Sequence, residues 1–194
     1  MTTTDQVRHD VLEACQALAA YGFGAMIGGH VSARVPGEEL YATTVLDKTL
    51  SELTFDDIVL MDFDDRVVGD SRVISPGIDF HSGIYKLRPD VNGIVHTHGY
   101  AITAQSAFGR PPRVFHNLAS YFFGRTAVVP DDSIASIAKS LGDDDIAIII
   151  PWHGSITVGA DLGTAVALHH TLDYAARLDI DMSAAGAEPM PDDM

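Results

Sequence analysis

The chain is short of cysteine and of basic residues. Cys15 is the single cysteine among 194 residues, so no disulfide can form within the chain. It lies in an Ala/Leu-rich helical pattern, which indicates a small buried hydrophobic side chain without a catalytic role. Lysine and arginine together number 12 against 27 acidic residues, for a formal net charge of −15. Nucleic acid and anionic membranes require clustered positive charge, so neither is expected as a partner.

Long apolar runs are also missing. No stretch of the sequence approaches the roughly 20 consecutive apolar residues that a membrane-spanning helix needs. The first residues, Met1 to Asp5, lack the basic segment and apolar core of a secretory signal. The sequence therefore predicts a cytoplasmic protein with no membrane partner.

The composition is that of a folded protein, with 46% hydrophobic and 20% charged residues. A chain of 194 residues fits one domain with a sizeable core. We expect a single domain over residues 1–182. Residues 183–194 are small, acidic and interrupted by proline, which predicts a mobile acidic tail.

Two histidines close a predicted strand in the middle of the chain. The run Val91 to Val95 is apolar and follows Pro89, which indicates a short strand entering the core. Side chains alternate along a strand, so His96 and His98 project from the same face and can hold one metal ion. The alternative is that one histidine caps the strand and the other is a polar residue at a turn.

A third histidine occupies the same kind of place. Residues 146–150 form an unbroken, mainly β-branched run, typical of a strand buried on both faces. Pro151 ends this run, and His153 follows directly. His153 therefore also lies at the end of a predicted buried strand.

The other predicted elements alternate between helices and hairpins. Helices are expected from an N-cap at Thr4 or Asp5 to Tyr21, and over residues 79–88, 100–108, 133–141 (capped near Asp131 or Asp132) and 162–178, the last capped by Asp161. Strands are expected over residues 30–35, 40–45, 58–62, 66–69 and 126–129, and residues 114–123 are ambiguous between strand and helix. His169 and His170, adjacent in the last helix, are interpreted as a packing or surface pair.

Five blocks, in this order and spacing, resemble the class II aldolase/adducin superfamily over nearly the whole chain. They are Gly29 to Pro36, His81 to Tyr85, Arg88 to Val91, the pair His96 and His98, and His153 to Ser155. The resemblance implies an α/β fold, a three-layer α/β/α domain with a central, largely antiparallel sheet. It also implies a homotetramer with sites at subunit boundaries, and a divalent metal ion held by His96, His98 and His153.

The chain departs from the sugar-phosphate enzymes of this superfamily. Their acid/base glutamate lies four residues before the position of His81, which here is Gly77. Their phosphate-binding turns correspond to residues 43–47 and 75–77, which have lost the usual pattern. Asp79 is a nearby carboxylate, but on a helix it is displaced by about half a turn from residue 77. The resemblance is instead to the branch that includes metal-dependent decarboxylases, and it implies a small, unphosphorylated substrate.

Without that glutamate, the proton donor must be another residue. The candidates are His30, His81, His116 and Tyr121, with His30 and His81 preferred. Each has a structural alternative: His81 as a buried helix residue, and Tyr121 as part of the core or a subunit interface. Arg113 or Arg125 could hold a substrate carboxylate.

The first functional hypothesis is a divalent-metal-dependent carbon–carbon lyase of the aldolase or decarboxylase type. It would act on a small hydroxy-carbonyl or hydroxy-carboxylate through a metal-stabilised enolate. Zinc (Zn²⁺) is the first choice of metal, with Mn, Fe and Co as alternatives, because imidazole suits all four. The other hypotheses are a non-haem iron oxygenase on the same scaffold and a non-catalytic, adducin-like assembly module.

Overall fold

One mixed sheet of eight strands organises the molecule. The computed structural model describes residues 2–25 and 27–191. The sheet has the order β4-β3-β2-β1-β5-β8-β7-β6, and of its neighbouring described strands only β6 and β7 run parallel. The strands are β1 (His30–Arg34), β2 (Leu40–Thr44), β3 (Ile58–Asp62), β4 (Val67–Val68), β5 (Gly93–Thr97), β6 (Thr126–Val128), β7 (Ala147–Ile150) and β8 (Gly154–Gly159).

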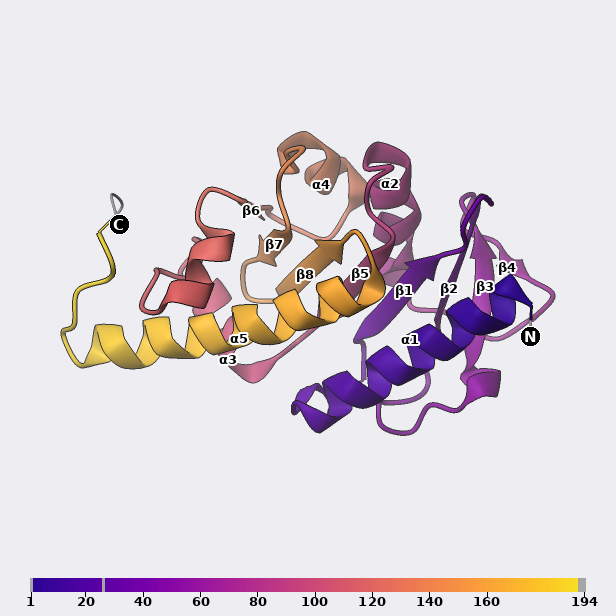
Figure 1. Ribbon diagram of the computed structural model, residues 1–194, viewed down its shortest axis with the longest axis horizontal. Helices are drawn as coiled ribbons and strands as arrows, with labels where there is room; N and C mark the ends of the chain where they lie inside the picture. The colour runs from indigo at the N-terminus through magenta and orange to yellow at the C-terminus, as the bar shows by residue number, and fades with distance from the viewer. Residues whose placement is uncertain (1, 26, 192–194) are drawn as a thin grey trace.

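Helices cover both faces of this sheet. Figure 1 shows α1 and α5 along one face, with α2 and α4 together on the other. The side chains explain this, because Val95 of β5 packs into the core beneath α1 and α5 while its neighbour Ile94 packs into the core beneath α2 and α4. The helices are α1 (Thr3–Ala20), α2 (Asp79–Leu87), α3 (Tyr100–Ser106), α4 (Ile134–Ser140) and α5 (Leu162–Ala184).

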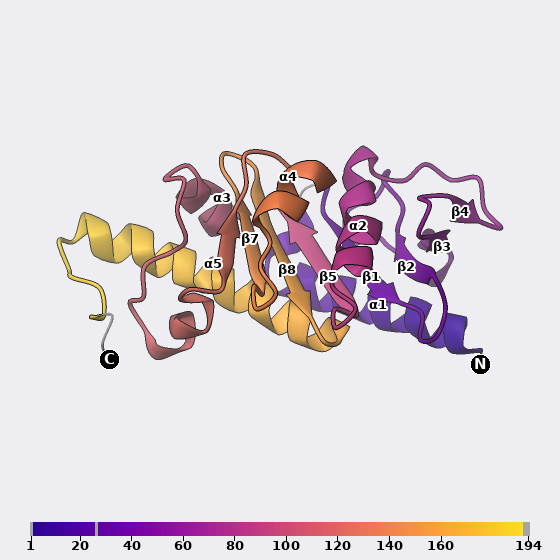
Figure 2. The ribbon, with the colours of Figure 1, turned by 90° about the horizontal axis from the view of Figure 1, so that it is seen from above.

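Helix α3 lies towards the far end of α5, beyond the central strands (Figure 2). There a third core joins Ile102 and Leu172 to Ile149 of β7. None of the helices in the described part of the chain has both the length and the apolar character needed to cross a membrane.

The structure corrects two predicted helix caps. The first helix is capped by Thr2, not by Thr4 or Asp5, because the Thr2 hydroxyl accepts from the Asp5 backbone N–H at 3.1 Å. The cap of α4 is Ser133, whose hydroxyl accepts from the Ser136 backbone N–H at 3.3 Å. Neither Asp131 nor Asp132 is therefore the N-cap of α4.

Three further elements differ from the prediction in their type or their length. The ambiguous residues 114–123 contain a short 3₁₀ helix, Asn117–Phe122. Strand β8 was not predicted, although residues 155–158 alternate polar and apolar side chains and three of them are β-branched. Helix α5 continues to Ala184, beyond the predicted end at residue 178.

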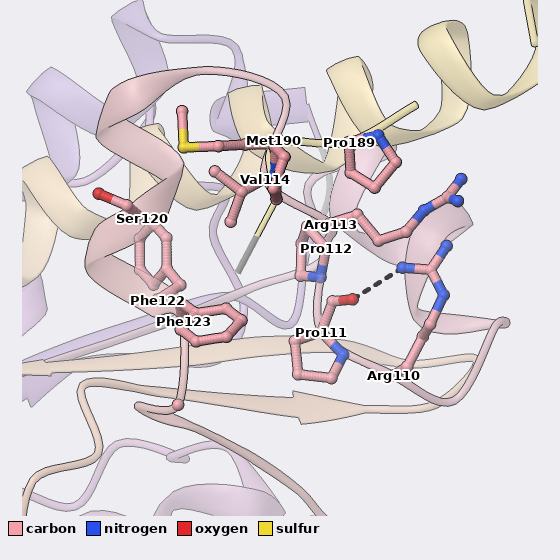
Figure 3. Close-up of a pocket in the computed structure, with 12 residues that line it drawn as sticks. Arg110, Pro111, Pro112, Arg113, Val114, Ser120, Phe122, Phe123, Pro189 and Met190 are labelled. Atoms are coloured by element: carbon pink, nitrogen blue, oxygen red, sulfur yellow. Dashed lines mark hydrogen bonds between the residues drawn. The ribbon is translucent and has the colours of Figure 1, made fainter. Parts of the chain in front are cut away.

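The beginning of the predicted tail is attached to the rest of the chain. Residues 183 and 184 belong to α5, and the Met190 backbone N–H donates to the Val114 carbonyl at 2.7 Å. Pro189 and Met190 face Phe122 and Phe123 across an apolar cavity of about 450 Å³ (Figure 3). Residues 192–194 lie outside the described residues, and the boundary at residue 182 stays a prediction.

Candidate metal centre

Sheet pairing brings the three predicted ligands to one edge. Strand β5 pairs with β8 in antiparallel register, with Thr97 opposite Ser155, so the end of β5 meets the start of β8. His98 comes directly after β5 and His153 directly before β8. His96, His98 and His153 each offer a ring nitrogen, and among the described residues these atoms lie within 4.8 Å of one another. The structure therefore brings together the three residues chosen as ligands.

The turn that positions His153 is strained. Strands β7 and β8 are joined by only three residues, Pro151 to His153, and Trp152 adopts a φ of 59°. A tryptophan in the left-handed region costs free energy, and such conformations persist where the surrounding structure enforces them. Here that conformation belongs to the turn that directs His153 to the end of β5.

The ring contacts leave nitrogen atoms free for a ligand. Nδ1 of His96 donates to the Ser155 carbonyl at 2.9 Å, so its Nε2 carries no proton and is available to a metal. Nε2 of His98 is buried and has no hydrogen-bond partner within the described structure. A buried nitrogen without a partner is costly unless something binds it. These residues fit a divalent cation.

The protonation state also suits a metal. Burial lowers the pKa of His96 well below its usual value, and the neighbouring histidines lower it further. Burial and the proximity of His153 lower the pKa of His98, while the negative charge of Asp132 raises it. Because neutral imidazole is the form that ligates metals, no proton has to be displaced at pH 7.

A buried hydrogen-bonded chain begins beside these ligands. Strand pairing places His30 opposite His96, and their rings are 4.8 Å apart. Nδ1 of His30 lies 2.7 Å from Nε2 of His81, and Nδ1 of His81 lies 2.6 Å from the Ser32 hydroxyl. The Ser32 hydroxyl in turn lies 2.7 Å from the Tyr85 hydroxyl.

This chain, from His30 through His81 and Ser32 to Tyr85, can pass a proton along its length. Burial lowers the pKa of both His30 and His81 well below the usual value, so both rings are neutral at pH 7. Sequence reasoning found the two histidines but missed Ser32 and Tyr85. The signal was present: Ser32 shares a strand face with His30, and Tyr85 lies one helical turn after His81.

Comparison with known proteins decides the family. The family model "Class II Aldolase and Adducin N-terminal domain" matches residues 9–180. The chain belongs to this family. A solved structure of L-fuculose 1-phosphate aldolase from Glaciozyma antarctica superposes with a TM-score of 0.90 at 27% identity, covering 99% of this chain and 80% of that one.

Two curated relatives of this class II aldolase family member carry out other reactions by name. One is 4-hydroxy-3-prenylphenylpyruvate oxygenase/4-hydroxy-3-prenylbenzoate synthase of Streptomyces roseochromogenus, 32% identical over 79% of this chain and 59% of its own length. The other is decarboxylase NovR of Streptomyces niveus, 30% identical over 76% of this chain and 58% of its own length. The chain thus spans less than two thirds of either relative.

The remaining predicted site residues of this family member lie apart from the ligands. His116 caps the 3₁₀ helix by accepting from the Leu118 backbone N–H, and its ring packs on Tyr174. Tyr121 is 57% exposed. Arg113 pairs with the buried Asp179 at 2.9 Å, and the Arg125 guanidinium donates to the Asp144 carbonyl. Within one chain, these four residues are therefore not brought to the three histidines.

His169, interpreted as part of a packing or surface pair, supports the strand that carries the ligands. The Thr157 hydroxyl donates to the Ala165 carbonyl, so it accepts from Nδ1 of His169, 3.1 Å away. Nε2 of His169 then accepts from the hydroxyl of Thr97, the residue between His96 and His98, at 2.7 Å. His170, by contrast, is exposed and stacks on Tyr21.

We expect Gly154→Ala to damage this centre. A Cβ at residue 154 would lie 2.5 Å from the Thr97 carbonyl oxygen and 3.2 Å from the His98 ring, so β8 would have to move away from β5. Overpacking of this kind costs about 3 kcal/mol of unfolding free energy. Urea unfolding and Zn²⁺ titration would measure both losses. Gly163→Ala, in the first turn of α5, is the control and should be neutral or stabilising, and equal effects of the two variants would contradict the expectation.

Proposed function

We propose that this chain is a divalent-metal-dependent carbon–carbon lyase of the aldolase or decarboxylase type. Its substrate would be a small, unphosphorylated hydroxy-carbonyl or hydroxy-carboxylate. The observation that carries the proposal is the set of three imidazoles, His96, His98 and His153, whose ring nitrogens lie within 4.8 Å of one another. Three protein ligands leave coordination positions open to a substrate, unlike the closed shell of a structural metal site.

When bound, a divalent cation supplies the positive charge that stabilises the electron pair left behind when a carbon–carbon bond breaks. Zinc is the proposed metal, with Mn, Fe and Co as alternatives. The chain's own residues hold that ion, exclude water around His96, and move protons. His30 and His81 are the proposed proton carriers, since they link the ligand edge of the sheet to Ser32 and Tyr85.

The surroundings of Thr43 support an unphosphorylated substrate. Thr43 falls in the segment that corresponds to a phosphate-binding turn in related enzymes. Here its hydroxyl is fully buried in β2 and donates to the Val31 carbonyl at 3.0 Å. It is therefore not free to bind a phosphate group.

We also propose that the protein acts as a homo-oligomer, a tetramer by family resemblance. Tyr121 and His116 would then serve as proton donors where a second copy of the chain brings them to the ligands. The exposure of Tyr121, 57%, supports such a role, because a phenol held in one chain's own site would be covered by that chain.

The experiment uses Zn²⁺-loaded protein in D₂O with two probes, dihydroxyacetone and hydroxymalonate. We expect the enzyme either to exchange the hydrogens beside the carbonyl of dihydroxyacetone for deuterium or to release CO₂ from hydroxymalonate. Either reaction should be at least about 100-fold faster than in Zn²⁺-containing buffer without protein. NMR and CO₂ trapping measure these rates. If neither probe reacts, the lyase proposal fails, and the adducin-like assembly module becomes the better explanation.

The second candidate is a non-haem iron oxygenase. It is favoured by the relative whose name includes an oxygenase, at 32% identity. Ferrous iron with open coordination positions can activate oxygen, whereas a lyase needs none. Fe²⁺-loaded protein would therefore consume oxygen with substrate and be inactive anaerobically, and equal anaerobic turnover would exclude this candidate.

A further inference from the structure

A carboxylate and an imidazole both approach Gly77. A Cβ placed on Gly77 would lie 3.2 Å from Oδ2 of Asp132 and 3.9 Å from Nε2 of His30. The two groups are far apart in the sequence, since His30 begins β1 and Asp132 follows β6. Both atoms lie within 4 Å of that one position, so the absence of a side chain at residue 77 lets Asp132 approach His30 closely.

Asp132 has no structural task that would explain it. The cap of α4 is Ser133, and the neighbouring Asp131 accepts from the Ser133 backbone N–H at 3.0 Å. Within the described part of the chain, the Asp132 carboxylate takes part in no hydrogen bond or ion pair that would hold it. It is half-buried all the same. Its oxygens are not among the buried polar atoms of the described residues that lack a partner, so this carboxylate is open to solvent and to a ligand.

The same carboxylate lies near the metal ligands without joining them. Its negative charge raises the pKa of His98, against the lowering by burial. The cluster of potential ligand atoms within 4.8 Å, searched over the described residues, contains the three histidines and not Asp132. A carboxylate that does not ligate a cation keeps its capacity to take and give a proton.

We propose that Asp132 is the catalytic acid/base carboxylate of this site, acting from beside Gly77 and His30. The proposal rests on the lyase function and names the residue that performs its proton transfer. Of the two carboxylates near residue 77, Asp79 is exposed on α2, whereas Asp132 faces His30. His30 and the chain behind it then exchange protons with Asp132 or with the substrate between them.

The proton taken up by Asp132 during aldol cleavage is returned within the same reaction. In aldol cleavage, Asp132 takes the proton of the hydroxyl on the departing carbon. The electron pair of that O–H bond forms the carbonyl of the released aldehyde, the carbon–carbon bond breaks, and its pair passes into the enolate. Asp132 then delivers the same proton to the enolate carbon, so two carbonyl products form with no net change in protons.

The first test compares Asp132→Asn with Asp79→Asn in Zn²⁺-loaded protein, using dihydroxyacetone and hydroxymalonate as probes. We expect Asp132→Asn to retain one equivalent of Zn²⁺ and the wild-type melting temperature, and to lose at least about 100-fold in rate on whichever probe the wild type turns over. Asp79→Asn should stay within about 2-fold of the wild type. A wild-type rate in Asp132→Asn, or an equal loss in Asp79→Asn, overturns the role of Asp132.

The second test needs no turnover. Glycolate, an unreactive hydroxy-carboxylate, is titrated into Co²⁺-loaded protein and followed by the cobalt absorption spectrum. Removing the Asp132 charge relieves repulsion of this anion, so Asp132→Asn should bind glycolate several-fold more tightly, while Asp79→Asn should not change. An unchanged affinity in Asp132→Asn would mean that the carboxylate does not face the ligand, which overturns the proposal.

A third variant tests whether a carboxylate at residue 77 can replace the one at residue 132. Gly77 does not have a positive φ, so a side chain is permitted there. In Gly77→Glu/Asp132→Ala, a carboxylate on residue 77 takes the place of the one removed from residue 132. We expect this double variant to react at least about 10-fold faster than Asp132→Ala. No turnover by the wild type would sink the lyase function and the role of Asp132 together. Turnover that survives in Asp132→Asn would sink that role alone.

Discussion

We expect His96→Ala to abolish stoichiometric metal binding. His96 is 1% exposed, and its Nδ1–H is fixed by the Ser155 carbonyl, so its Nε2 is the nitrogen available to an ion shared with His98 and His153. Loss of a residue that merely orients a ligand costs about 10–100-fold in metal affinity, so loss of the ligand itself should cost more than about 100-fold. Protein dialysed against Zn²⁺ and analysed by elemental mass spectrometry should change from one equivalent to none.

Because His96 is buried in β5, the experiment needs a variant that leaves the sheet intact. His153→Ala removes a partly exposed ligand in a turn and should lose metal to the same extent. His170→Ala removes an exposed histidine of α5 and should keep one equivalent. Circular dichroism checks that all three variants are folded. Metal retained by both His96→Ala and His153→Ala would refute the ligand assignment.

Acid should destabilise the metal-free protein through His169. Burial lowers the pKa of His169 to about 3, below the value of 6.5 expected in the unfolded chain. The unfolded state therefore binds a proton below pH 6.5 that the folded state refuses, so stability is complete above pH 6.5 and falls as the pH drops towards 3. Between pH 7 and pH 5 this single residue should cost about 2 kcal/mol of unfolding free energy.

His169→Gln isolates that contribution, since glutamine can still form hydrogen bonds with Thr97 and Thr157 but does not titrate. Urea unfolding at pH 7 and pH 5, in the presence of a chelator, should show a smaller loss of stability with acid in His169→Gln than in the wild type, by about 2 kcal/mol. His170→Gln, on the exposed side of the same helix, should behave as the wild type does. Equal acid sensitivity of wild type and His169→Gln would contradict the buried, neutral state of His169.

The sequence singled out the three histidines that the structure brings together because their signal is local. His96 and His98 are two residues apart at the end of an apolar strand, and His153 follows another, so strand periodicity alone selects them. The family blocks gave the same three residues. The helices were predicted for a similar reason, since apolar residues one turn apart mark a buried face wherever that face packs.

The residue that caps a helix and the neighbours of a strand in the sheet were less predictable. At the start of α1, Thr2 and Thr4 are equally good caps by composition, and only the hydrogen bond to Asp5 distinguishes them. Residues 155–158 carry a strand pattern of their own, so β8 itself could have been predicted. Its position between β5 and β7 could not, because strand order depends on contacts between distant segments.

By itself the sequence determined the family, and it selected the three candidate ligands His96, His98 and His153 and pointed to Gly77 as a departure from related enzymes. Only the tertiary structure decided what stands around that trio: the link from His30 to Tyr85, the support of Thr97 by His169, and the carboxylate of Asp132 facing Gly77. The physical reason is the separation in sequence of the residues that interact. A periodic pattern is set by residues a few positions apart, whereas Gly77 and Asp132 meet because α2 and α4, the helices that follow them, pack together on one face of the sheet.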